Sequence, residues 1–585
     1  MNQLKNKTVL VFGEDARSFL TVIRSLHQAG MVVDVVCFSN TSVALKSNCI
    51  NKKYGLNHQA MTVNEWRDEV EKIILSNHYD IVIPCDERAL FPLMDIKDNI
   101  STSTTFALPE RKILGPLFDK VETRHTAELC DIAVAKGERL NISNTSYSHL
   151  CQKFNLPLVL KPTQSYDEED LNKRQSVKIA HNEQHFLKFQ QDYANQQCLV
   201  ESYFTGYGIG VSILAKNGKV KAAFAHARVS EPETGGGSSY RKAITIEPTM
   251  LYACQKLCMH LAYTGVAMFE FKYNPKTTDW ILIEVNARFW GSLPLAVFAG
   301  VDFPAMYAHV LLEKYTPDCL TYNQSAYARN FSADIYDMQE EFTSLKQKKG
   351  SLKATTQLTK RILSLFRLLT TNERLDSFLW QDQKPFWFEF YYLFKDKLHR
   401  LPVIREKKQK ANVKQFQQKL LKQPDNILFI CYGNIMRSPF AGKLFEQKIK
   451  GTALANIKVD SFGFHQIENR KAKPQCIEMA KRWDINLENH TSKWLSQKHC
   501  LTPNTLLVIL DKKNEYLLQS FYPEVNYISL ADLVPKSMGF YHEIKDPYDM
   551  PKDYLEKCYQ LIDASIDELI NILHAYVDNS GKRQF

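Results

Sequence analysis

The sequence predicts a multidomain α/β protein, and three observations lead to this expectation. The chain has 585 residues, 44% of them apolar, which is enough for three or more packed units. Near the start, "KTVLVFGEDARSFLTVIRSLHQAGMVVDVVCF" reads as strand, loop, helix and strand, the order that opens a doubly wound sheet. Much later, "NILFICYGNIMRSPFAGKLFEQ" again reads as strand, tight loop and helix.

Residues 1–115 are expected to form one α/β domain, because "YDIVIPCDERALFPL" repeats the strand-and-helix order of the opening stretch. A dinucleotide site is not expected there. Gly13 follows the first strand, but the second and third glycines of the dinucleotide fingerprint are missing.

Residues 116–315 place charged side chains at the ends of apolar, strand-like runs such as "NLPLVLKPTQ", "QQCLVESYFTG", "GVAMFEFKYNP" and "WILIEVNARFWGS". Such charges are costly unless a ligand or metal binds there, so the pattern predicts a binding site. Glu270, Glu284 and Asn286 supply oxygen donors on two adjacent runs, which suits Mg²⁺ and nucleotide phosphates.

Basic side chains complete this predicted site. Lys120 and Lys161 are expected to meet the phosphates, and Arg288 is expected to stabilise charge on a transferring phosphoryl group. Together these segments resemble the ATP-grasp superfamily over about residues 5–315, most specifically in "EVNARFWGS". The resemblance implies a pre-ATP-grasp α/β domain at 1–115, followed by the α+β lobes of an ATP-grasp domain at 116–315.

The resemblance also implies a reaction. ATP would lie between the two lobes with Glu201 near the adenine hinge, Mg²⁺ on Glu270, Glu284 and Asn286, and Arg288 beside an acyl phosphate. A carboxylate would be activated by ATP and then attacked by an amine or thiol, giving ADP and phosphate. "HARVSEPETGGGSSYRKA" resembles the arginine- and glycine-rich segment of the carbamoyl-phosphate-synthetase-like branch, which would hold anionic substrate groups.

One segment departs from the family pattern. The usual glycine-rich loop over the phosphates is replaced by "TQSYDEEDLNKRQSVKIA", whose four acidic residues at 167–170 would repel a triphosphate. A second interpretation therefore stays open, in which Glu284 and Lys161 form structural ion pairs in a non-catalytic relative that binds nucleotide or a partner.

Residues 316–400 are predicted to be a helical extension, whose leucines and isoleucines at helical spacing are expected to pack against the ATP-grasp part. The basic segment 401–424 is expected to be a solvated, partly helical linker. An alternative is that the aromatic block "QKPFWFEFYYLFKDKL" just before it rests on an anionic membrane or a partner.

The stretch around Cys431 predicts a reactive thiol. A loop between a strand and a helix directs several backbone N–H groups at one point, and a thiol in such a cradle ionises readily. Arg437 can return over the loop and bind two phosphate oxygens, and Ser438 can donate a hydrogen bond to the thiolate. Phosphoryl transfer to sulfur also needs a general acid, which Asp546 in "EIKDPYDMP" can supply.

These residues resemble the low-molecular-weight protein tyrosine phosphatases over about residues 425–577, a fold with a parallel sheet flanked by helices. "CYGNIMRS" fits their C-x-G-N-x-x-R-S loop, and "DPY" follows in the family's order. The resemblance implies Cys431 as nucleophile, Arg437 as phosphate binder, and Asp546 as general acid and then base. It further implies that Asn434 and Ser438 support the loop and that Tyr548 lines the aryl pocket.

Composition narrows the remaining possibilities. The net charge of +10 is concentrated near residues 395–423, without the aromatic interleaving of an RNA platform, so no nucleic-acid partner is expected. The start lacks a secretory pattern, and the thirteen cysteines include no CxxC pair, so the cytoplasm is the expected location. Zinc at Cys254 and Cys258 is not expected, because no further ligands stand at a suitable spacing.

Two hypotheses for the whole chain follow. In the first, both halves catalyse, and the phosphatase acts on a phosphotyrosine protein such as a bacterial tyrosine kinase of polysaccharide export. In the second, the ATP-grasp half is a nucleotide sensor or scaffold that brings the phosphatase to its target. A third and weaker hypothesis is dephosphorylation of a small molecule made upstream.

Overall fold

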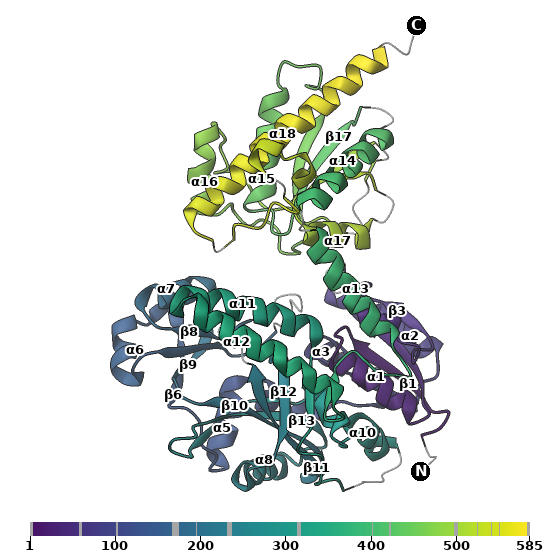
Figure 1. Ribbon diagram of the computed structural model, residues 1–585, viewed down its shortest axis with the longest axis vertical. Coiled ribbons are helices and arrows are strands. Elements are labelled where there is room, and N and C mark those ends of the chain that lie inside the picture. Colours follow the sequence, from purple (N-terminus) through teal and green to yellow (C-terminus); the bar gives the residue numbers. More distant parts are fainter. Residues whose placement is uncertain are drawn as a thin grey trace. The chain divides into compact units, whose positions relative to one another are not determined.

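Figure 1 shows the computed structural model. It describes residues 4–57, 61–100, 103–166, 175–194, 196–230, 237–312, 318–399, 402–420, 423–496, 501–502, 504–522, 525–539, 541–548 and 550–581. The chain divides into two compact units: the first contains residues 1–58 and 63–390, and the second contains residues 59–62 and 391–585. Within the described residues, no helix is long and apolar enough to cross a membrane.

The N-terminal sheet of the first unit has five parallel strands, as the opening strand–helix–strand pattern predicts. Because parallel strands end at one edge, the loops after its first and fourth strands lie on the same side. In spatial order the strands are β3 (Lys53–Gly55), β2 (Val32–Cys37), β1 (Thr8–Gly13), β4 (Ile81–Pro84) and β5 (Thr105–Phe106). Its helices are α1 (Ser18–Gln28), α2 (Val63–Ser76) and α3 (Glu87–Ile96), with a 3-10 turn η1 (Val43–Lys46).

A smaller antiparallel sheet of four strands forms one lobe beyond it. Helices α6 (Tyr147–Phe154) and α7 (Glu183–Asp192) cover its core, which includes Leu160, Phe186 and Val200. The strands, in spatial order, are β6 (Gly137–Asn141), β9 (Gln197–Ser202), β7 (Leu158–Pro162) and β8 (Lys178–Ala180).

The largest sheet of the first unit has seven strands, antiparallel except for its last pair. In order they are β14 (Trp280–Asn286), β13 (Gly265–Tyr273), β10 (Tyr207–Lys216), β11 (Lys219–Ser230), β12 (Tyr240–Ile244), β15 (Tyr327–Arg329) and β16 (Glu373–Leu375). The accompanying helices are η2 (Arg111–Ile113), α4 (Leu114–Phe118), α5 (Lys120–Leu129), α8 (Pro248–His260), α9 (Leu293–Phe298) and α10 (Phe303–Leu312), whereas the 3-10 turn η3 (Ile142–Asn144) belongs to the smaller lobe and contacts α7. Helix α1 packs on α9 and α10 in a shared apolar core, which joins the N-terminal sheet to this one.

The segment after residue 315 is helical as expected, and it also completes the large sheet with β15 and β16. Its helices are α11 (Phe331–Lys349), α12 (Ser351–Ser364), η4 (Leu365–Leu369) and α13 (Lys384–His399), and α11 and α12 form a hairpin (Figure 1). The expectation that its leucines face inward holds only in part for α12, where Leu358 is partly buried. There the buried residues are Ala354 and Arg361, whereas Leu352 and Leu363 are exposed.

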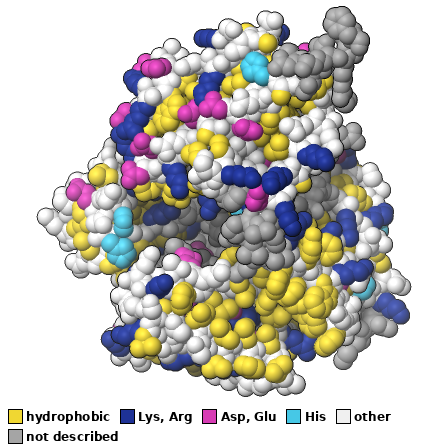
Figure 2. All heavy atoms as spheres, turned by 45° about the horizontal axis from the view of Figure 1, so that its top comes forward, with side chains coloured by type: hydrophobic (Ala, Val, Ile, Leu, Met, Phe, Trp, Pro, Cys, Tyr) yellow, Lys and Arg dark blue, Asp and Glu magenta, His cyan; other side chains and the backbone are white. Residues whose placement is uncertain are grey.

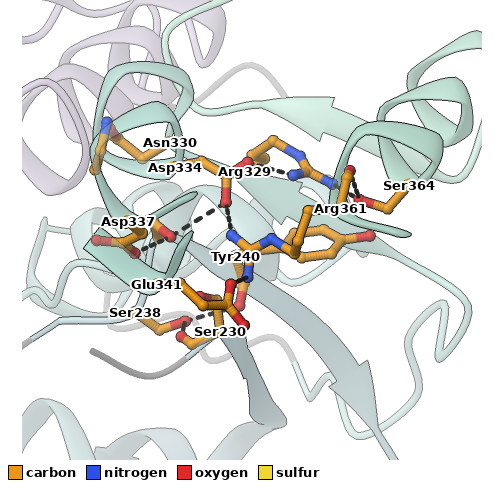
Figure 3. Close-up of polar contacts among 12 residues, drawn as sticks. Ser230, Ser238, Tyr240, Arg329, Asn330, Asp334, Asp337, Glu341, Arg361 and Ser364 are labelled. Atoms are coloured by element: carbon orange, nitrogen blue, oxygen red, sulfur yellow. Dashed lines mark hydrogen bonds and ion pairs between the residues drawn. The ribbon is translucent and has the colours of Figure 1, made fainter. Parts of the chain in front are cut away.

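A buried network of charges fixes the orientation of α12 (Figure 3). Arg329 of β15 is fully buried and pairs with Glu373 of β16, with Nε 2.9 Å from Oε1, and with one carboxylate oxygen of Asp334 in α11. Arg361 of α12 binds the other oxygen of Asp334, and the Arg329 guanidinium stacks 3.8 Å above the Tyr240 ring. Because the ion pair places Arg361 on the inner face, Leu352 and Leu363 on the opposite face are exposed.

Replacing Asp334 with alanine is expected to destabilise this part of the first unit by about 3–5 kcal/mol, because two buried arginines lose their shared carboxylate. Hydrogen exchange of the β15 and β16 amides measures the loss. Asp318→Ala is the control, since the Asp318 side chain is 70% exposed and pairs with Lys221 only at 3.4 Å. Equal exchange in the two variants would contradict the structural role of the network.

The second unit is a parallel sheet flanked by helices, as predicted. The strands, in spatial order, are β18 (Lys458–Gly463), β17 (Asn426–Cys431), β19 (Thr505–Ile509) and β20 (Tyr527–Ser529). Its α-helices are α14 (Pro402–Lys419), α15 (Arg437–Ile449), α16 (Pro474–Ala480), α17 (Lys512–Phe521) and α18 (Lys552–Gly581). Short 3-10 turns are η5 (Lys481–Trp483), η6 (Leu530–Leu533) and η7 (Lys536–Met538).

The basic segment 401–424 differs from the solvated linker that composition suggested. It is helical, but Phe416 and Leu420 are buried in the core of the second unit. Arg405 pairs with Asp532 at 2.9 Å, and helix α14 contacts η6 and β20. The net charge of the segment concealed a helical apolar spacing, in which Val413 and then Phe416 and Leu420 recur on one face.

Candidate functional site

The first candidate site is the loop from Cys431 to Ser438, here called the cysteine loop. Strand β17 ends at Cys431 and helix α15 begins at Arg437, so the loop has the predicted strand–loop–helix setting. The Asn434 backbone N–H donates to Cys431 Sγ at 3.2 Å, and Ser438 Oγ–H donates at 3.1 Å. Asn434 has a left-handed backbone (φ 51°), which turns its N–H inward, and both donors stabilise negative charge on the sulfur.

Arg437 is fully buried at the base of the loop. Its Nη1 donates to Asp511 Oδ2 at 2.6 Å and to the Ile544 carbonyl at 2.8 Å, and its Nη2 donates to Asp546 Oδ2 at 2.6 Å. Burial alone would lower the pKa of Arg437, but Asp546, Cys431 and Asp511 raise it above the ordinary value, so the guanidinium stays charged. The buried Nε has no hydrogen-bond partner among the described residues, which leaves one donor for an anion.

Further residues hold the loop in shape. Asn434 Nδ2 donates to Ser438 Oγ at 2.9 Å and to Ser461 Oγ at 3.0 Å, and Asn434 Oδ1 accepts the Lys493 N–H at 2.9 Å. His490 Nε2 lies 2.8 Å from the Asn434 carbonyl, and burial lowers the pKa of this imidazole. The predicted support roles of Asn434 and Ser438 thus have a definite set of contacts.

Asp546 and Tyr548 come from the segment before α18. Asp546 is partly exposed and reaches Arg437, and its Oδ1 accepts the Tyr548 N–H at 3.2 Å. Tyr548 is 43% exposed, and the Lys473 ammonium lies 4.7 Å from its ring centre. Residues predicted from segments more than one hundred positions apart therefore meet at one loop.

Sequence reasoning missed Asp511, which fixes Arg437. It follows the apolar run of β19, the neighbouring parallel strand, and its Oδ1 also accepts the Asn514 N–H at the start of α17. The sequence did contain one signal for Asp511, its position directly after a strand. Side chains that follow adjacent parallel strands lie at the same edge of the sheet.

The second candidate site lies at strands β13 and β14 and is called the acidic pair. Glu270 and Glu284 are direct partners in the antiparallel register, so two like charges face each other. Arg228 Nη2 lies 3.2 Å from Glu270 Oε2, and Asn286 Nδ2 donates to Glu284 Oε1 at 3.0 Å. The side-chain carbonyl oxygen of Asn286 can therefore serve as a metal ligand, and together with the two carboxylates it forms a set of hard oxygen ligands that fits Mg²⁺.

The described residues include no group of three or more His, Cys, Asp or Glu side chains placed to hold a metal ion. Two carboxylates and one amide are nevertheless compatible with Mg²⁺, which usually keeps waters and takes further oxygens from substrate phosphates. Residues Glu270, Glu284 and Asn286 would hold the ion.

Two lysines lie close to the acidic pair. Burial lowers the pKa of Lys120, against the opposing attraction of Glu284 and Glu87, and Lys120 Nζ lies 3.2 Å from Ser165 Oγ. Burial would raise the pKa of Glu284, but Lys120, Asn286, Lys161 and Arg288 together lower it. The charges that the sequence predicted to share one site therefore act on one another.

Glu201 lies in a buried ion-pair cluster. Its buried carboxylate lies 2.6 Å from Lys161 Nζ and 3.2 Å from Arg124 Nη1. The carboxylate is thus occupied by two cations, and its contact with Lys161 fixes that ammonium at the strand end of β7.

Arg288 lies between the large sheet and the N-terminal sheet. Its Nε and Nη2 each lie 3.3 Å from Glu87 Oε1, at the start of α3. Burial would lower the pKa of Arg288, but Glu87, Asp86 and Glu284 raise it. Glu87 was not predicted, because its contact with Arg288 joins segments 201 residues apart.

Arg241 is a third residue that was not predicted. Its Nη1 donates to the Gly291 carbonyl at 2.9 Å, three residues beyond Arg288, and its Nη2 pairs with Asp376 at 2.6 Å. The extension therefore supports the segment that carries Arg288. The acidic residues Asp167, Glu168, Glu169 and Asp170 and most of the glycine-rich segment 231–237 lie outside the described residues.

Comparisons with known proteins agree with these two sites. The family model described as low molecular weight phosphotyrosine protein phosphatase matches residues 426–579, and the model described as ATP-grasp in the biosynthetic pathway with Ter operon matches residues 194–333.

Curated relatives match the second unit. The low molecular weight protein-tyrosine-phosphatase Wzb of Escherichia coli (strain K12) is 28% identical over 156 residues, which are 26% of this chain and 97% of the relative. Etp of the same strain is 26% identical over 151 residues, which are 25% of this chain and 91% of the relative.

Solved structures match the first unit more distantly. An L-amino acid ligase from Bacillus licheniformis is 15% identical, with a TM-score of 0.42, covering 53% of this chain and 75% of that one. N5-carboxyaminoimidazole synthetase from Staphylococcus aureus is 12% identical, with a TM-score of 0.42, covering 55% and 81%. Residues 194–333 thus match an ATP-grasp family model, and residues 426–579, which contain the cysteine loop, match a low molecular weight phosphotyrosine protein phosphatase model.

Proposed function

We propose that the protein is bifunctional, with a phosphotyrosine phosphatase in the second unit and an ATP- and Mg²⁺-dependent carboxylate–amine ligase in the first. The observation that carries the phosphatase is the meeting of Cys431, Ser438, Arg437 and Asp546 at the cysteine loop. The target is a phosphotyrosine protein, and a tyrosine kinase of polysaccharide export is the partner that we favour.

The phosphatase steps follow from the positions of these groups. Cys431 Sγ attacks phosphorus while Arg437 and the loop amides hold the phosphoryl oxygens, and Asp546 gives its proton to the departing phenoxide. Water then attacks the phosphocysteine with Asp546 as base, which releases phosphate and restores the thiolate.

The ligase proposal rests on the acidic pair with Lys120, Lys161 and Arg288 around it. Glu270, Glu284 and Asn286 would hold Mg²⁺, Lys120 and Lys161 would meet phosphate oxygens, and Arg288 would stabilise charge on the transferring phosphoryl group. Bound ATP supplies the chemical activation of the carboxylate. We further propose that a carboxylic acid and an amine are the two substrates of the ligase and that the protein acts in the cytoplasm.

A sensor or scaffold is the alternative for the first unit. The pairing of Lys161 with Glu201, which Arg124 also contacts, favours it, because an ammonium already neutralised in a buried pair has less charge to offer a triphosphate. Such a unit would bind ATP without turnover.

Glu284→Gln is expected to reduce acceptor-dependent ADP release by at least about ten-fold, because it removes a ligand charge from the acidic pair. ADP is measured with Mg²⁺ and pooled carboxylic acids and amines in a Cys431→Ser background, so that the phosphatase cannot hydrolyse intermediates. Glu247→Gln, at an exposed carboxylate, is the matched control. ATP binding without ADP release in any pool would support the scaffold.

A further inference from the structure

The outward face of helix α12 and turn η4 has a composition unusual for a soluble protein. Leu352 is 83% exposed, Leu363 57%, Phe366 63% and Leu369 83%. A surface helix normally buries its leucines and exposes its polar residues, whereas α12 buries Ala354 and Arg361. A group of exposed apolar side chains on a folded protein often marks a site of interaction with a membrane or another protein.

The exposed apolar residues form one ridge. At about 100° per residue, Leu352, Thr359 and Leu363 fall within about 40° of one another, on the side opposite Ala354 and Arg361. Phe366 and Leu369 continue the ridge into η4. We call residues 346–369 the α12 face. On the face of the molecule drawn in Figure 2, apolar side chains gather at the surface in places, with Lys and Arg side chains near them.

The charges of the α12 face have one sign. Between residues 342 and 372 the chain contains no aspartate or glutamate. Exposed lysines stand at positions 346, 348, 349, 353 and 360, around the turn between α11 and α12 and along one flank of the ridge. Glu341, the nearest acidic residue of α11, accepts a hydrogen bond from Gln357 at 2.9 Å and lies 3.8 Å from Arg361, on the inner side.

The buried charge network fixes the position of the α12 face on the first unit. Arg361 is tied to Asp334, and Asp334 to Arg329 of the large sheet, so α12 is folded and oriented before any partner arrives (Figure 3). A partner therefore does not need to supply the free energy of ordering the helix.

We propose that the α12 face docks on an anionic lipid surface. A lipid interface accepts an apolar helical ridge at the acyl boundary while flanking lysines meet acidic headgroups. A second copy of the chain fits less well, because a two-fold contact would bring two sets of lysines together. The site is separate from the aromatic block at 384–397 and independent of the proposed ligase and phosphatase activities.

Sedimentation of the full-length protein with vesicles tests this. Binding is expected to phosphatidylserine–phosphatidylcholine vesicles, to fall with salt, and to be weak on phosphatidylcholine alone. The double variant Leu363→Ser, Phe366→Ser should reduce the partition coefficient at least about ten-fold, since two exposed apolar side chains leave the interface. Lys353→Glu with Lys360→Glu should reduce it by roughly 25-fold or more, at about five-fold for each lost lysine.

Matched controls lie on other elements of the first unit. Met259→Ser changes an apolar residue of α8 that is 71% exposed, and Lys276→Glu changes an exposed lysine in the β13–β14 turn. Both should bind vesicles like the unaltered protein, and circular dichroism should show all variants folded, because the altered side chains are exposed.

Three results would overturn the proposal. The first is no binding of the unaltered protein to acidic vesicles. The second is binding that the α12-face variants retain but Trp387→Ser loses, which would place the lipid contact in the aromatic block. The third is self-association in analytical ultracentrifugation that the Leu363→Ser, Phe366→Ser variant abolishes, without vesicle binding, which would assign the face to a second copy.

Discussion

Replacing Cys431 with serine is expected to reduce turnover of phosphotyrosine by at least about 10⁴-fold. The sulfur is the strongest nucleophile of the cysteine loop, and a serine in its place offers a hydroxyl that is much harder to deprotonate. The serine keeps the size of the side chain and can still accept from the Asn434 N–H and Ser438 Oγ–H. Phosphate binding should therefore persist while chemistry stops.

Two measurements separate these effects. Steady-state hydrolysis of a phosphotyrosine peptide reports the chemical loss, and isothermal titration with the same peptide reports retained binding. Cys476→Ala is the control, because Cys476 is also buried in the second unit and burial raises the pKa of its thiol to about 12. It should keep activity within a few-fold. If Cys431→Ser kept measurable turnover, the nucleophile would be another group.

The cysteine loop could be predicted from the sequence because its parts are local. Cys431, Asn434, Arg437 and Ser438 lie within one strand–loop–helix unit, where spacing alone fixes which side chains face the loop centre. The parallel sheet of the second unit follows from the same kind of pattern. Asp511 could not be identified, because it reaches Arg437 through the order of strands in the sheet, which spacing along the chain does not determine.

The acidic pair could be predicted in part from the sequence. Glu270 and Glu284 were predicted to share a site, and their facing register gives that prediction a structural basis, although their role as metal ligands stays a prediction. Glu87, which pairs with Arg288, could not be anticipated because it belongs to another sheet.

For helix α12, hydrophobic periodicity does not predict which face of the helix is buried. Leu352 and Leu363 share one face, whereas the partly buried Leu358 lies on the side of Arg361, and spacing alone does not determine which of the two faces points inward. The orientation is decided by Arg361, whose pairing with Asp334 is a tertiary contact between residues 27 positions apart. For helix α14 the error was the reverse. Its many lysines led to the prediction of a solvated linker, whereas Phe416 and Leu420 on one face of the helix are buried.

Asp546→Asn is expected to slow phosphotyrosine and phenyl phosphate by about 10²–10⁴-fold, and aryl phosphates with good leaving groups by far less. The reason is chemical: a poor leaving group needs the proton that Asp546 donates, whereas a nitrophenolate departs without it. Asparagine can keep a hydrogen bond from Arg437 Nη2, so the loss should reflect the missing proton more than a displaced arginine.

Asp511→Asn is the decisive comparison, because both carboxylates contact the same guanidinium at 2.6 Å. Asp511 is paired with Nη1 and caps α17, so it positions Arg437 without facing the leaving group. Its loss should slow good and poor leaving groups by the same factor, because phosphate binding weakens for both. A plot of log kcat/KM against leaving-group pKa should therefore steepen in Asp546→Asn and keep its slope in Asp511→Asn. Equal slopes in the two variants would remove Asp546 from the role of general acid, and a steeper slope only in Asp511→Asn would transfer that role to Asp511.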